Sequence, residues 1–337
     1  MAISSVLGSS ALLPAGLGFR NVLINGGFDV WQRGTSTAFT STPSTSFLAD
    51  RWSGYRNTTG STQSQISAGL DGFQYALRMQ RDSGNTSASI IYIGQSLETS
   101  TATKLANKPV VLSFYARAGA NYSSASNALR VLLYNGTGTE ANGVHVAFTS
   151  ATNVISTTAT LTTSWQRFTY YAVMPATSSQ LTVQLDWTPS GTAGANDYVD
   201  ITGVQLEQNY QPTPFEQRPF GVELALCQRY YERITATTSS LYETIGIGGW
   251  GSSTQFACTY YYFTPKRVKP SVFSTTQIDC LYHGVAWQAV TSVTSYNEIS
   301  HRAVTIYYTC SGSSAQGQAG VAVFKTLGAY IEIMAEL

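Results

Sequence analysis

Hydrophobic and polar residues alternate along most of this chain with a period of two. That period places every second side chain on the same face of a strand, so it is typical of strands with one buried face. The hydrophobic members of four such runs are Leu112, Phe114 and Ala116; Leu129, Val131 and Leu133; Phe168, Tyr170, Ala172 and Met174; and Leu181, Val183, Leu185 and Trp187. Stretches rich in Ser, Thr, Gly and Asn separate the runs. Eight or more strands at this spacing predict a β-sandwich of the jelly-roll type over residues 20–210.

The last strand predicted in this region changes its alternation at a glycine. Val199 and Ile201 keep one phase, and Val204 and Leu206 take up the other. The shift falls at Gly203. Because a β-bulge inserts one extra residue into a strand and so reverses the alternation, a bulge is predicted there.

Residues 211–233 interrupt the strand pattern. They begin with Gln-Pro-Thr-Pro-Phe-Glu-Gln-Arg-Pro, and prolines at this density favour an extended chain that ends the sandwich. From Gly221 to the end of this range, Val222, Ala225 and Leu226 share one face at helical spacing. We therefore expect a Pro-rich linker followed by a short connecting α-helix.

Strand-like alternation returns over residues 234–337. Its buried positions are predicted to be Phe256, Cys258, Tyr260 and Tyr262; Val304, Ile306, Tyr308 and Cys310; and Ala329, Ile331, Ile333, Ala335 and Leu337. A hydrophobic strand that runs to the last residue must be paired or buried, so we expect the chain end to be part of the structure. No internal repeat of fixed period occurs, which argues against a β-helix or a propeller. The chain is predicted to be all-β, with a jelly roll, a short helix and a second domain that is sandwich-like.

Charged side chains are scarce in this sequence. They make up 11% of the 337 residues, against roughly 25% in an average soluble domain. With a net charge of +1, the chain has no basic footprint for nucleic acid or for an anionic membrane, and no window holds the ~20 apolar residues of a membrane span. A β-rich protein with so few charges needs another way to cover its sheet edges. Pairing with sister chains is one, so the composition favours an assembly subunit.

The sequence contains no recognisable catalytic or metal-binding motif. The four cysteines Cys227, Cys258, Cys280 and Cys310 show no Cys-x-x-Cys pair or zinc-site spacing, so we interpret them as free thiols of the core. The three histidines lie far apart, and no pattern selects the two carboxylates that glycan hydrolysis requires. Residues 246–251 match G-x-G-x-x-G, but a strand pattern follows where a dinucleotide site needs a helix. We expect neither an enzyme nor a cofactor.

Two stretches resemble proteins of bacteriophage particles. Residues 21–33, Asn-Val-Leu-Ile-Asn-Gly-Gly-Phe-Asp-Val-Trp-Gln-Arg, and 49–52, Ala-Asp-Arg-Trp, resemble the opening of a domain common in phage fibre proteins. That domain is similar to carbohydrate-binding modules with the galactose-binding-like jelly roll. Residues 212–232 resemble the connector of many phage tail-fibre and virion structural proteins, which often end, as this chain does, in Ala-Glu-Leu.

The resemblance assigns roles to a few residues. The family's Asn-Gly-Phe, its strand tryptophan and its Asp-rich turn would correspond to Asn25, Gly26 and Phe28, to Trp165, and to Asp200. Trp165 is expected to pack in the core, because it opens a strongly alternating strand.

Some modules of this fold hold a structural calcium between the first and last strands. By the resemblance, Asp200 and the backbone near Asn25 would be its ligands. Calcium takes six to eight oxygens, whereas an aspartate in a turn needs no metal to explain it, so both interpretations stay open.

Aromatic residues beside glycines and small polar residues are candidates for stacking under a sugar ring. They are Trp187, Trp250, Tyr122 and Tyr134. Tyrosine and tryptophan serve equally well in subunit interfaces, which is the alternative interpretation.

The resemblance implies a tail-fibre or spike subunit, made in the host cytoplasm and incorporated in the virion. It implies a homotrimer that docks to other virion proteins through residues 1–19 and contacts host cell-surface polysaccharide with the jelly roll. A structural head fibre or capsid decoration protein without a ligand is one alternative. A polysaccharide depolymerase is the second.

Overall fold

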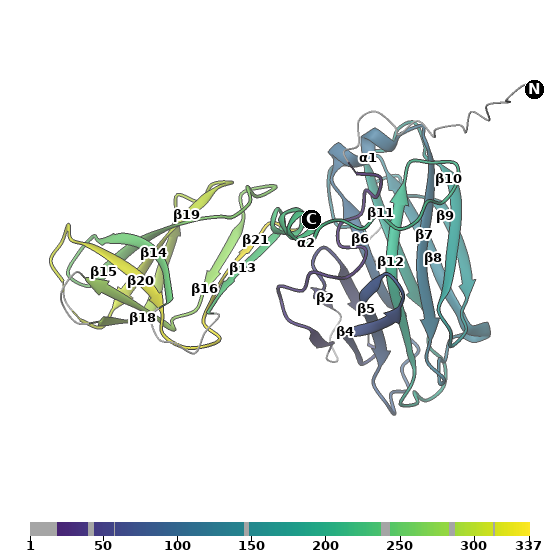
Figure 1. The fold of residues 1–337 in the computed structure, drawn as a ribbon, viewed down its shortest axis with the longest axis horizontal. Helices are drawn as coiled ribbons and strands as arrows, with labels where there is room; N and C mark the ends of the chain where they lie inside the picture. Colours follow the sequence, from purple (N-terminus) through teal and green to yellow (C-terminus); the bar gives the residue numbers. More distant parts are fainter. Residues whose placement is uncertain are drawn as a thin grey trace, which may run out of the picture. The chain divides into compact units, whose positions relative to one another are not determined.

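The computed structural model describes residues 19–39, 44–56, 58–144, 148–236, 243–282, 287–312 and 314–337 (Figure 1). The predicted attachment segment, residues 1–19, lies outside this range except for Phe19. The described residues form twenty-one β-strands and two short α-helices, α1 (Thr99–Leu105) and α2 (Phe220–Gln228), which confirms the all-β fold. Neither described helix is long and apolar enough to cross a membrane.

The contacts divide the chain into two compact units that are interleaved in sequence. The N-terminal unit contains the described residues up to Gly27, with those of Ala38–Ser46 and Ser53–Gln217. The C-terminal unit contains Phe28–Thr37, Phe47–Trp52 and Arg218–Leu337. Two segments from the start of the chain thus pack with its last third, where the sequence suggested consecutive domains.

Two six-stranded sheets build the N-terminal unit. In spatial order, sheet A is β1 (Ser36–Phe39), β4 (Ser61–Leu70), β5 (Phe73–Arg81), β12 (Tyr198–Glu207), β7 (Pro109–Ala118) and β10 (Gln166–Val173). Sheet B is β2 (Ser44–Phe47), β3 (Ser53–Arg56), β6 (Ile91–Leu97), β11 (Gln180–Trp187), β8 (Ala128–Gly136) and β9 (Thr152–Thr160).

The predicted alternation puts the hydrophobic faces of these strands inside. Phe114 on β7 and Val131 on β8 are fully buried, as is Leu185 on β11. Burial of one face of each sheet against the other is the arrangement of a β-sandwich. The jelly-roll prediction is therefore confirmed at the level of the fold.

The predicted bulge lies in β12. The pairing of β12 with β7 shifts register between Thr202 and Gln205, and Gly203 has a φ of 62°. A side chain is strained in this left-handed region, which explains why glycine occupies the position.

The connecting helix is shorter than predicted. It ends at Gln228, and the next strand, β13 (Tyr231–Thr235), pairs with β21 (Tyr330–Met334). The prediction of a helix to Arg233 was wrong because residues near the C-terminus offer a strand partner. A strand partner about 100 residues away cannot be inferred from a local helical pattern.

The remaining strands form a closed barrel and a small sheet. The barrel order is β14 (Glu243–Trp250), β15 (Gln255–Tyr261), β19 (Ala303–Cys310), β18 (Trp287–Asn297), β17 (Ile278–Tyr282) and β20 (Ala319–Phe324). The small sheet is β13, β21 and β16 (Ser271–Ser274). Where a sandwich-like arrangement was expected, the strands close on themselves, and closure leaves no unpaired edge. The last strand, β21, is the central one of its sheet, which confirms the prediction that it is paired or buried.

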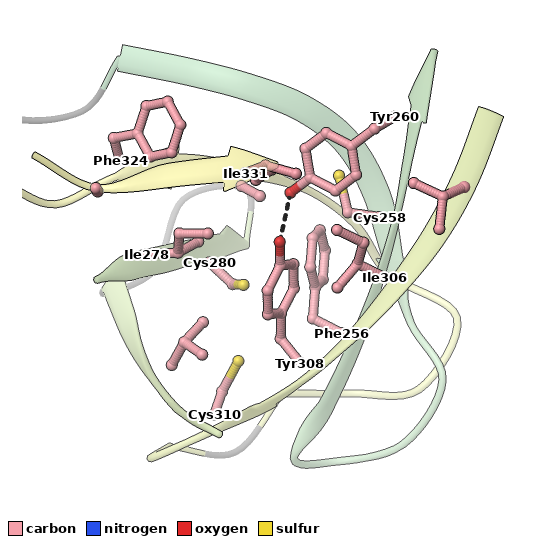
Figure 2. Packing of buried hydrophobic residues seen from close by; sticks show 14 of the residues in the cluster. Phe256, Cys258, Tyr260, Ile278, Cys280, Ile306, Tyr308, Cys310, Phe324 and Ile331 are labelled. Atoms are coloured by element: carbon pink, nitrogen blue, oxygen red, sulfur yellow. Dashed lines mark hydrogen bonds between the residues drawn. The ribbon is translucent and has the colours of Figure 1, made fainter. Parts of the chain in front are cut away.

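Figure 2 shows the core of the C-terminal unit. The hydroxyls of Tyr260 and Tyr308 form a buried hydrogen bond of 2.9 Å. All four cysteines are buried free thiols, as predicted. Burial raises the pKa of Cys258 to about 11, so this thiol stays protonated and behaves as a core side chain.

Two arginines from the start of the chain bind its end. Arg33 and Arg51 contact the carboxylate of Glu336 at 3.1 and 2.5 Å. Their guanidinium carbons lie over the rings of Tyr231 and Tyr230, at 3.4 and 3.6 Å from the ring centroids. These contacts explain how the Ala-Glu-Leu ending is held within the C-terminal unit.

Candidate functional site

A row of polar and aromatic residues crosses the outer face of sheet B. Tyr55 on β3 is paired with Tyr92 on β6, Tyr92 with Asp186 on β11, and Asp186 with Arg130 on β8. Directly paired residues on one face of an antiparallel sheet have Cβ atoms about 4.5–5.5 Å apart. Four strands thereby bring these four side chains into one continuous row.

The centre of the row is an ion pair between Arg130 and Asp186. Arg130 donates from Nε to Oδ1 at 2.8 Å and from Nη2 to Oδ2 at 3.0 Å, and Gln184 donates to Oδ2 at 2.7 Å. The side chain of Asp186 is 2% exposed, whereas that of Arg130 is 42% exposed. The buried carboxylate therefore orients a guanidinium that faces solvent.

Tyrosines flank this ion pair. The rings of Tyr55 and Tyr92 meet edge to face, with centroids 5.7 Å apart, and both are half-buried. Burial, and then the charge of Asp186, raises the pKa of Tyr92; burial also raises the pKa of Tyr134 on β8. Their hydroxyls remain protonated at neutral pH and can donate hydrogen bonds.

A cleft of about 320 Å³ adjoins the row where β11 ends and β8 begins. Its lining residues are Ser124, Ala125, Ala128, Arg130, Thr158, Asp186, Trp187, Thr188, Pro189 and Ser190. Small and polar side chains predominate among them. Among these described lining residues, Asp186 is the one that carries a carboxylate.

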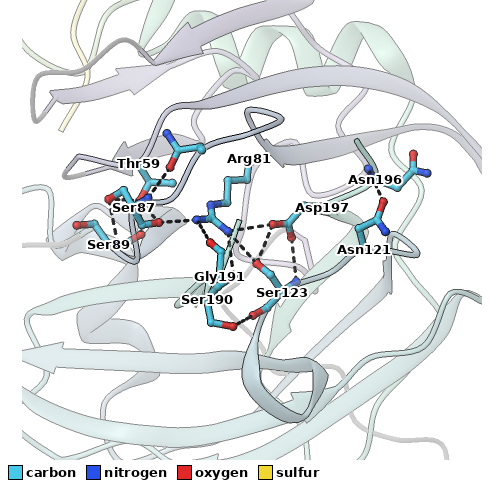
Figure 3. A network of polar contacts seen from close by, with 11 residues as sticks. Thr59, Arg81, Ser87, Ser89, Asn121, Ser123, Ser190, Gly191, Asn196 and Asp197 are labelled. Atoms are coloured by element: carbon cyan, nitrogen blue, oxygen red, sulfur yellow. Dashed lines mark hydrogen bonds and ion pairs between the residues drawn. The ribbon is translucent and has the colours of Figure 1, made fainter. Parts of the chain in front are cut away.

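A buried polar network holds the loops that wall the cleft (Figure 3). Arg81 and Asp197 form an ion pair of 3.3 Å, and neither side chain is exposed to solvent. Asp197 also accepts hydrogen bonds from the backbone N–H and the hydroxyl of Ser123, at 2.9 and 2.7 Å. Arg81 donates to the carbonyl oxygens of Ser190 and Gly191 at 3.1 and 2.8 Å. Both cleft loops are thus fixed to one ion pair.

The residues that precede the undescribed segment 145–147 cover another part of the same face. Ser96 accepts a hydrogen bond from the backbone N–H of Gly143 at 2.9 Å and contacts Thr182 at 2.7 Å. Ser96 and Thr182 are buried although they lie on the outer face of the sheet. The row lies further along the same strands, and there the side chain of Arg130 is 42% exposed.

The structure distributes the four predicted sugar-stacking residues differently. Tyr134 lies beside the row and is half-buried. Tyr122 and Trp187 pack against each other, with ring centroids 4.8 Å apart, and are 8% and 1% exposed. Trp250 is 2% exposed and packs on Phe256 in the barrel. Neither tryptophan presents a ring face to solvent, because both close the ends of strands whose hydrophobic faces are buried.

The positions named by the resemblance have mainly structural environments. Phe28 packs on Trp52, with ring centroids 5.1 Å apart, and both are fully buried. A Cβ on Gly26 would lie 2.0 Å from the carbonyl oxygen of Val204, so only glycine fits beside β12. Trp165, expected in the core, lies half-buried on the outer face of sheet A, since its position alternates with the inward Phe168 series.

The calcium candidate does not fit a metal site. Asp200 is fully buried, and its two oxygens accept hydrogen bonds from Arg78 at 2.7 and 3.0 Å and from Arg117 at 2.9 Å. Two guanidiniums supply the positive charge that an ion would provide. Asn25 is buried with a φ of 57°, and the described residues contain no group of three or more His, Cys, Asp and Glu that could hold a metal ion.

Sequence reasoning missed most of the row. Arg130 and Asp186 occupy the polar phase of strands whose hydrophobic phase was recognised, whereas the strands that carry Tyr55 and Tyr92 were not among the predicted runs. A charged or aromatic residue in a polar phase is unremarkable by itself. The site becomes recognisable only from the register in which the four strands pair, and this register cannot be read from the sequence.

No family model matches the chain, and no curated protein matches it. Among solved structures, a family 4 carbohydrate-binding module is 16% identical over 55% of this chain and 98% of its own, with a TM-score of 0.32. A family 61 module, TmCBM61, solved with β-1,4-galactotriose, is 13% identical over 57% of this chain and all of its own, with a TM-score of 0.33. The enzymatically active domain of bacteriophage CBA120 tailspike protein 4 is 12% identical over 56% of this chain and 21% of its own, with a TM-score of 0.30.

Proposed function

We propose that the sandwich domain binds a carbohydrate chain along the row from Tyr55 to Arg130, and that the protein is a subunit of a phage virion appendage. The observation that carries the binding proposal is the row itself, in which an oriented guanidinium lies between tyrosines beside an open cleft. The host cell-surface polysaccharide would be its ligand. The appendage role rests on the resemblance of the connector, residues 212–232.

The chemistry of the row suits a sugar. A pyranose has apolar C–H faces, which pack on aromatic rings, and hydroxyls at its edges, which need donors and acceptors. Tyr92 supplies a ring and a hydroxyl, and Arg130 supplies N–H groups whose direction is set by Asp186. A few oriented polar groups among aromatic side chains are typical of specific small-ligand sites.

Charge and volume narrow the kind of ligand. The positive charge of Arg130 is offset by Asp186 at 2.8 Å, so the row favours an uncharged sugar over an acidic one. The cleft of about 320 Å³ lies at the lower end of the ~300–1,000 Å³ usual for ligand pockets. A short stretch of a longer polysaccharide suits this volume.

The cleft favours binding over hydrolysis. Glycoside hydrolysis generally uses two carboxyl groups about 5–9.5 Å apart on either side of the bond. Among the described residues lining the cleft, Asp186 is the single carboxylate, and it is engaged by Arg130 and Gln184. A depolymerase would require a second acid at this position.

The surface of the C-terminal unit supports self-association, and we propose a homotrimer. Ile247 on β14 is 72% exposed and Tyr261 on β15 is 77% exposed. Ile247 is paired with Thr259, two residues before Tyr261, so both exposed side chains lie on one face of neighbouring strands, and contiguous apolar surface commonly marks a protein contact. Sedimentation equilibrium at micromolar concentration tests the trimer: a single species of monomer mass would overturn it.

Binding is tested with neutral polysaccharide fractions from host cell surfaces by isothermal titration calorimetry. Tyr92→Ala and Arg130→Gln should each weaken binding about tenfold or more, since each removes an oriented contact. Tyr171→Ala is the matched control, because Tyr171 is 52% exposed on the opposite sheet. Unchanged affinity in both row variants, with wild-type melting temperatures, would refute the site.

Two further measurements separate the alternatives. Incubation with the purified chain should leave the polymer length unchanged; shortening of the polymer would favour a depolymerase. Antibody labelling of the particles should place the subunit on tail fibres or spikes. Labelling confined to the capsid would favour the head-fibre or decoration role.

A further inference from the structure

The outer face of sheet A carries a second cluster of oriented arginines. Asp200 on β12 is paired in the sheet with Arg78 on β5 and with Arg117 on β7. Arg78 donates to both carboxylate oxygens, from Nε at 2.7 Å and from Nη2 at 3.0 Å. Arg117 donates from Nε alone, at 2.9 Å. One carboxylate thus lies between two guanidiniums.

The guanidinium of Arg117 is not needed to neutralise the Asp200 carboxylate. The bidentate contact from Arg78 already neutralises the carboxylate and occupies both its oxygens. In the described part of the chain, the two terminal nitrogens of Arg117 donate to no protein acceptor, and its side chain is 27% exposed. Arg78, Arg117 and Asp200 together therefore carry one net positive charge, and the two terminal nitrogens of Arg117 can still donate to a ligand.

Aromatic rings fix both guanidiniums. The guanidinium carbon of Arg117 lies 4.8 Å from the ring centroid of Trp165, whose indole donates to the carbonyl oxygen of Ala68 at 2.9 Å. The guanidinium carbon of Arg78 lies 3.5 Å from the ring centroid of Tyr198. Holding a long, partly exposed side chain in one rotamer costs conformational entropy, and a fork held in this way is preorganised for a ligand.

A third arginine extends the positive surface. Arg167 on β10 is paired with Tyr115, one row from Arg117 on the same face. Its guanidinium donates to the hydroxyl of Ser113 and to the carbonyl oxygen of Thr213, neither of which carries charge. Asp200 is therefore the one carboxylate set against three arginines in these two rows.

We propose that this face of sheet A is a second ligand site, which binds the carboxylate groups of an acidic polysaccharide through the terminal nitrogens of Arg117. A planar guanidinium fork matches a carboxylate bidentately, and the adjacent Trp165 offers a ring beside the sugar that carries it. The proposal takes its ligand class from the proposed function but does not require the row on sheet B. Acidic sugars would bind sheet A, and neutral sugars sheet B.

The test uses the full chain with oligogalacturonate and oligomannuronate, and with the methyl ester of the first as an uncharged equivalent. At least one of the two acids should bind, and its affinity should fall as the NaCl concentration is raised. The affinity for the methyl ester should be lower by a factor of about ten or more. Failure of both acids to bind, or equal binding of the acid and its ester, would overturn the proposal.

Arg117→Gln is the informative variant, because Arg78 still neutralises Asp200. It should lose about tenfold in affinity for the acid and none for a neutral ligand of sheet B. Lys104→Gln on α1 is the control, since it removes one exposed positive charge elsewhere in the same unit. Equal losses in the two variants would reduce the effect to net charge and refute the site. Tyr92→Ala should leave acid binding intact, which separates failure of this proposal from failure of the row on sheet B.

Discussion

Arg81 and Asp197 form an ion pair with a separation of 3.3 Å and no solvent exposure, at the end of the sandwich where the cleft loops meet. The strand β5 carries the arginine, and the aspartate precedes β12. Four residues around the pair, Ser87, Ser123, Ser190 and Gly191, are bound to it or to one another through serine hydroxyls and backbone groups, as Figure 3 shows. The loops of the cleft are therefore positioned by an ion pair that is buried and cannot contact a ligand in the cleft.

Arg81→Met should destabilise the N-terminal unit strongly. The variant leaves the Asp197 carboxylate buried without its counter-charge, and breaking a buried pair in this way costs about 3–5 kcal/mol. Urea denaturation followed by tryptophan fluorescence measures the loss. Arg20→Met, which removes the 35% exposed partner of a Glu216 side chain that is itself 16% exposed, should cost about 1 kcal/mol or less. Similar losses in the two variants would contradict the buried role of Arg81.

Tyr260 and Tyr308 should be energetically coupled. Removing one hydroxyl leaves the other buried without this 2.9 Å partner, whereas removing both leaves two matched apolar rings. Tyr260→Phe should cost about 1–3 kcal/mol of unfolding free energy, and the double variant with Tyr308→Phe less than the sum of the single costs. A double-mutant cycle by urea denaturation gives the coupling. Strict additivity would show that the hydroxyl pair contributes no coupling to the barrel.

The stability of the C-terminal unit should depend on pH through Asp50. Burial, opposed by Arg33 and Gln32, raises the pKa of Asp50 to about 6 from 3.8. A raised pKa means that the folded protein binds the proton more tightly than the unfolded chain. The contribution of this group therefore falls as pH rises from about 4 to about 6, by roughly 1 kcal/mol per pH unit, and stays low above that range.

Asp50→Asn isolates this effect from the titration of other carboxylates. The difference in unfolding free energy between wild type and variant, measured by urea denaturation at several pH values, should shift in favour of wild type on acidification from pH 7 to about 4. A difference that is independent of pH would exclude the raised pKa.

Gly26 should tolerate no larger residue. A Cβ at this position would lie 2.0 Å from the carbonyl oxygen of Val204, which belongs to β12 and cannot move without breaking the strand. Gly26→Ala should lower the melting temperature sharply, with a cost of about 1–3 kcal/mol as for overpacked sites. Gly221→Ala is the control, because no atom lies within 4 Å of its Cβ position and alanine favours the helix by about 0.5–1 kcal/mol. Equal melting temperatures for wild type and Gly26→Ala would contradict the close approach.

Local patterns predicted the strands well. The inward positions of β7, β8, β10 and β11 followed from alternation, and the bulge followed from the phase change at Gly203. The helix was located but not its end, since Tyr231–Thr235 pairs with the last strand of the chain. The arrangement of the barrel and the interleaving of the units also depend on partners far away in sequence.

The candidate site was predicted only in part. Tyr134 was recognised as an aromatic beside a polar loop, and it lies by the row. Trp187 and Trp250 were selected on the same reasoning but are buried, because a strand-end tryptophan can turn inward as readily as outward. Trp165 showed the opposite error, since the ring expected in the core lies on the surface beneath Arg117.

The sequence by itself determined that this protein is all-β, that most of residues 20–210 form a sandwich and that its cysteines are buried, because strand period and burial are encoded by neighbouring residues. Only the tertiary structure decided which side chains meet. Tyr92, Asp186 and Arg130 come from three strands whose order in the sheet is not their order in the chain, and the same holds for Arg78, Asp200 and Arg117. A one-residue change of register would turn each of these side chains to the opposite face, so both surfaces depend on the pairing of strands that are distant in sequence.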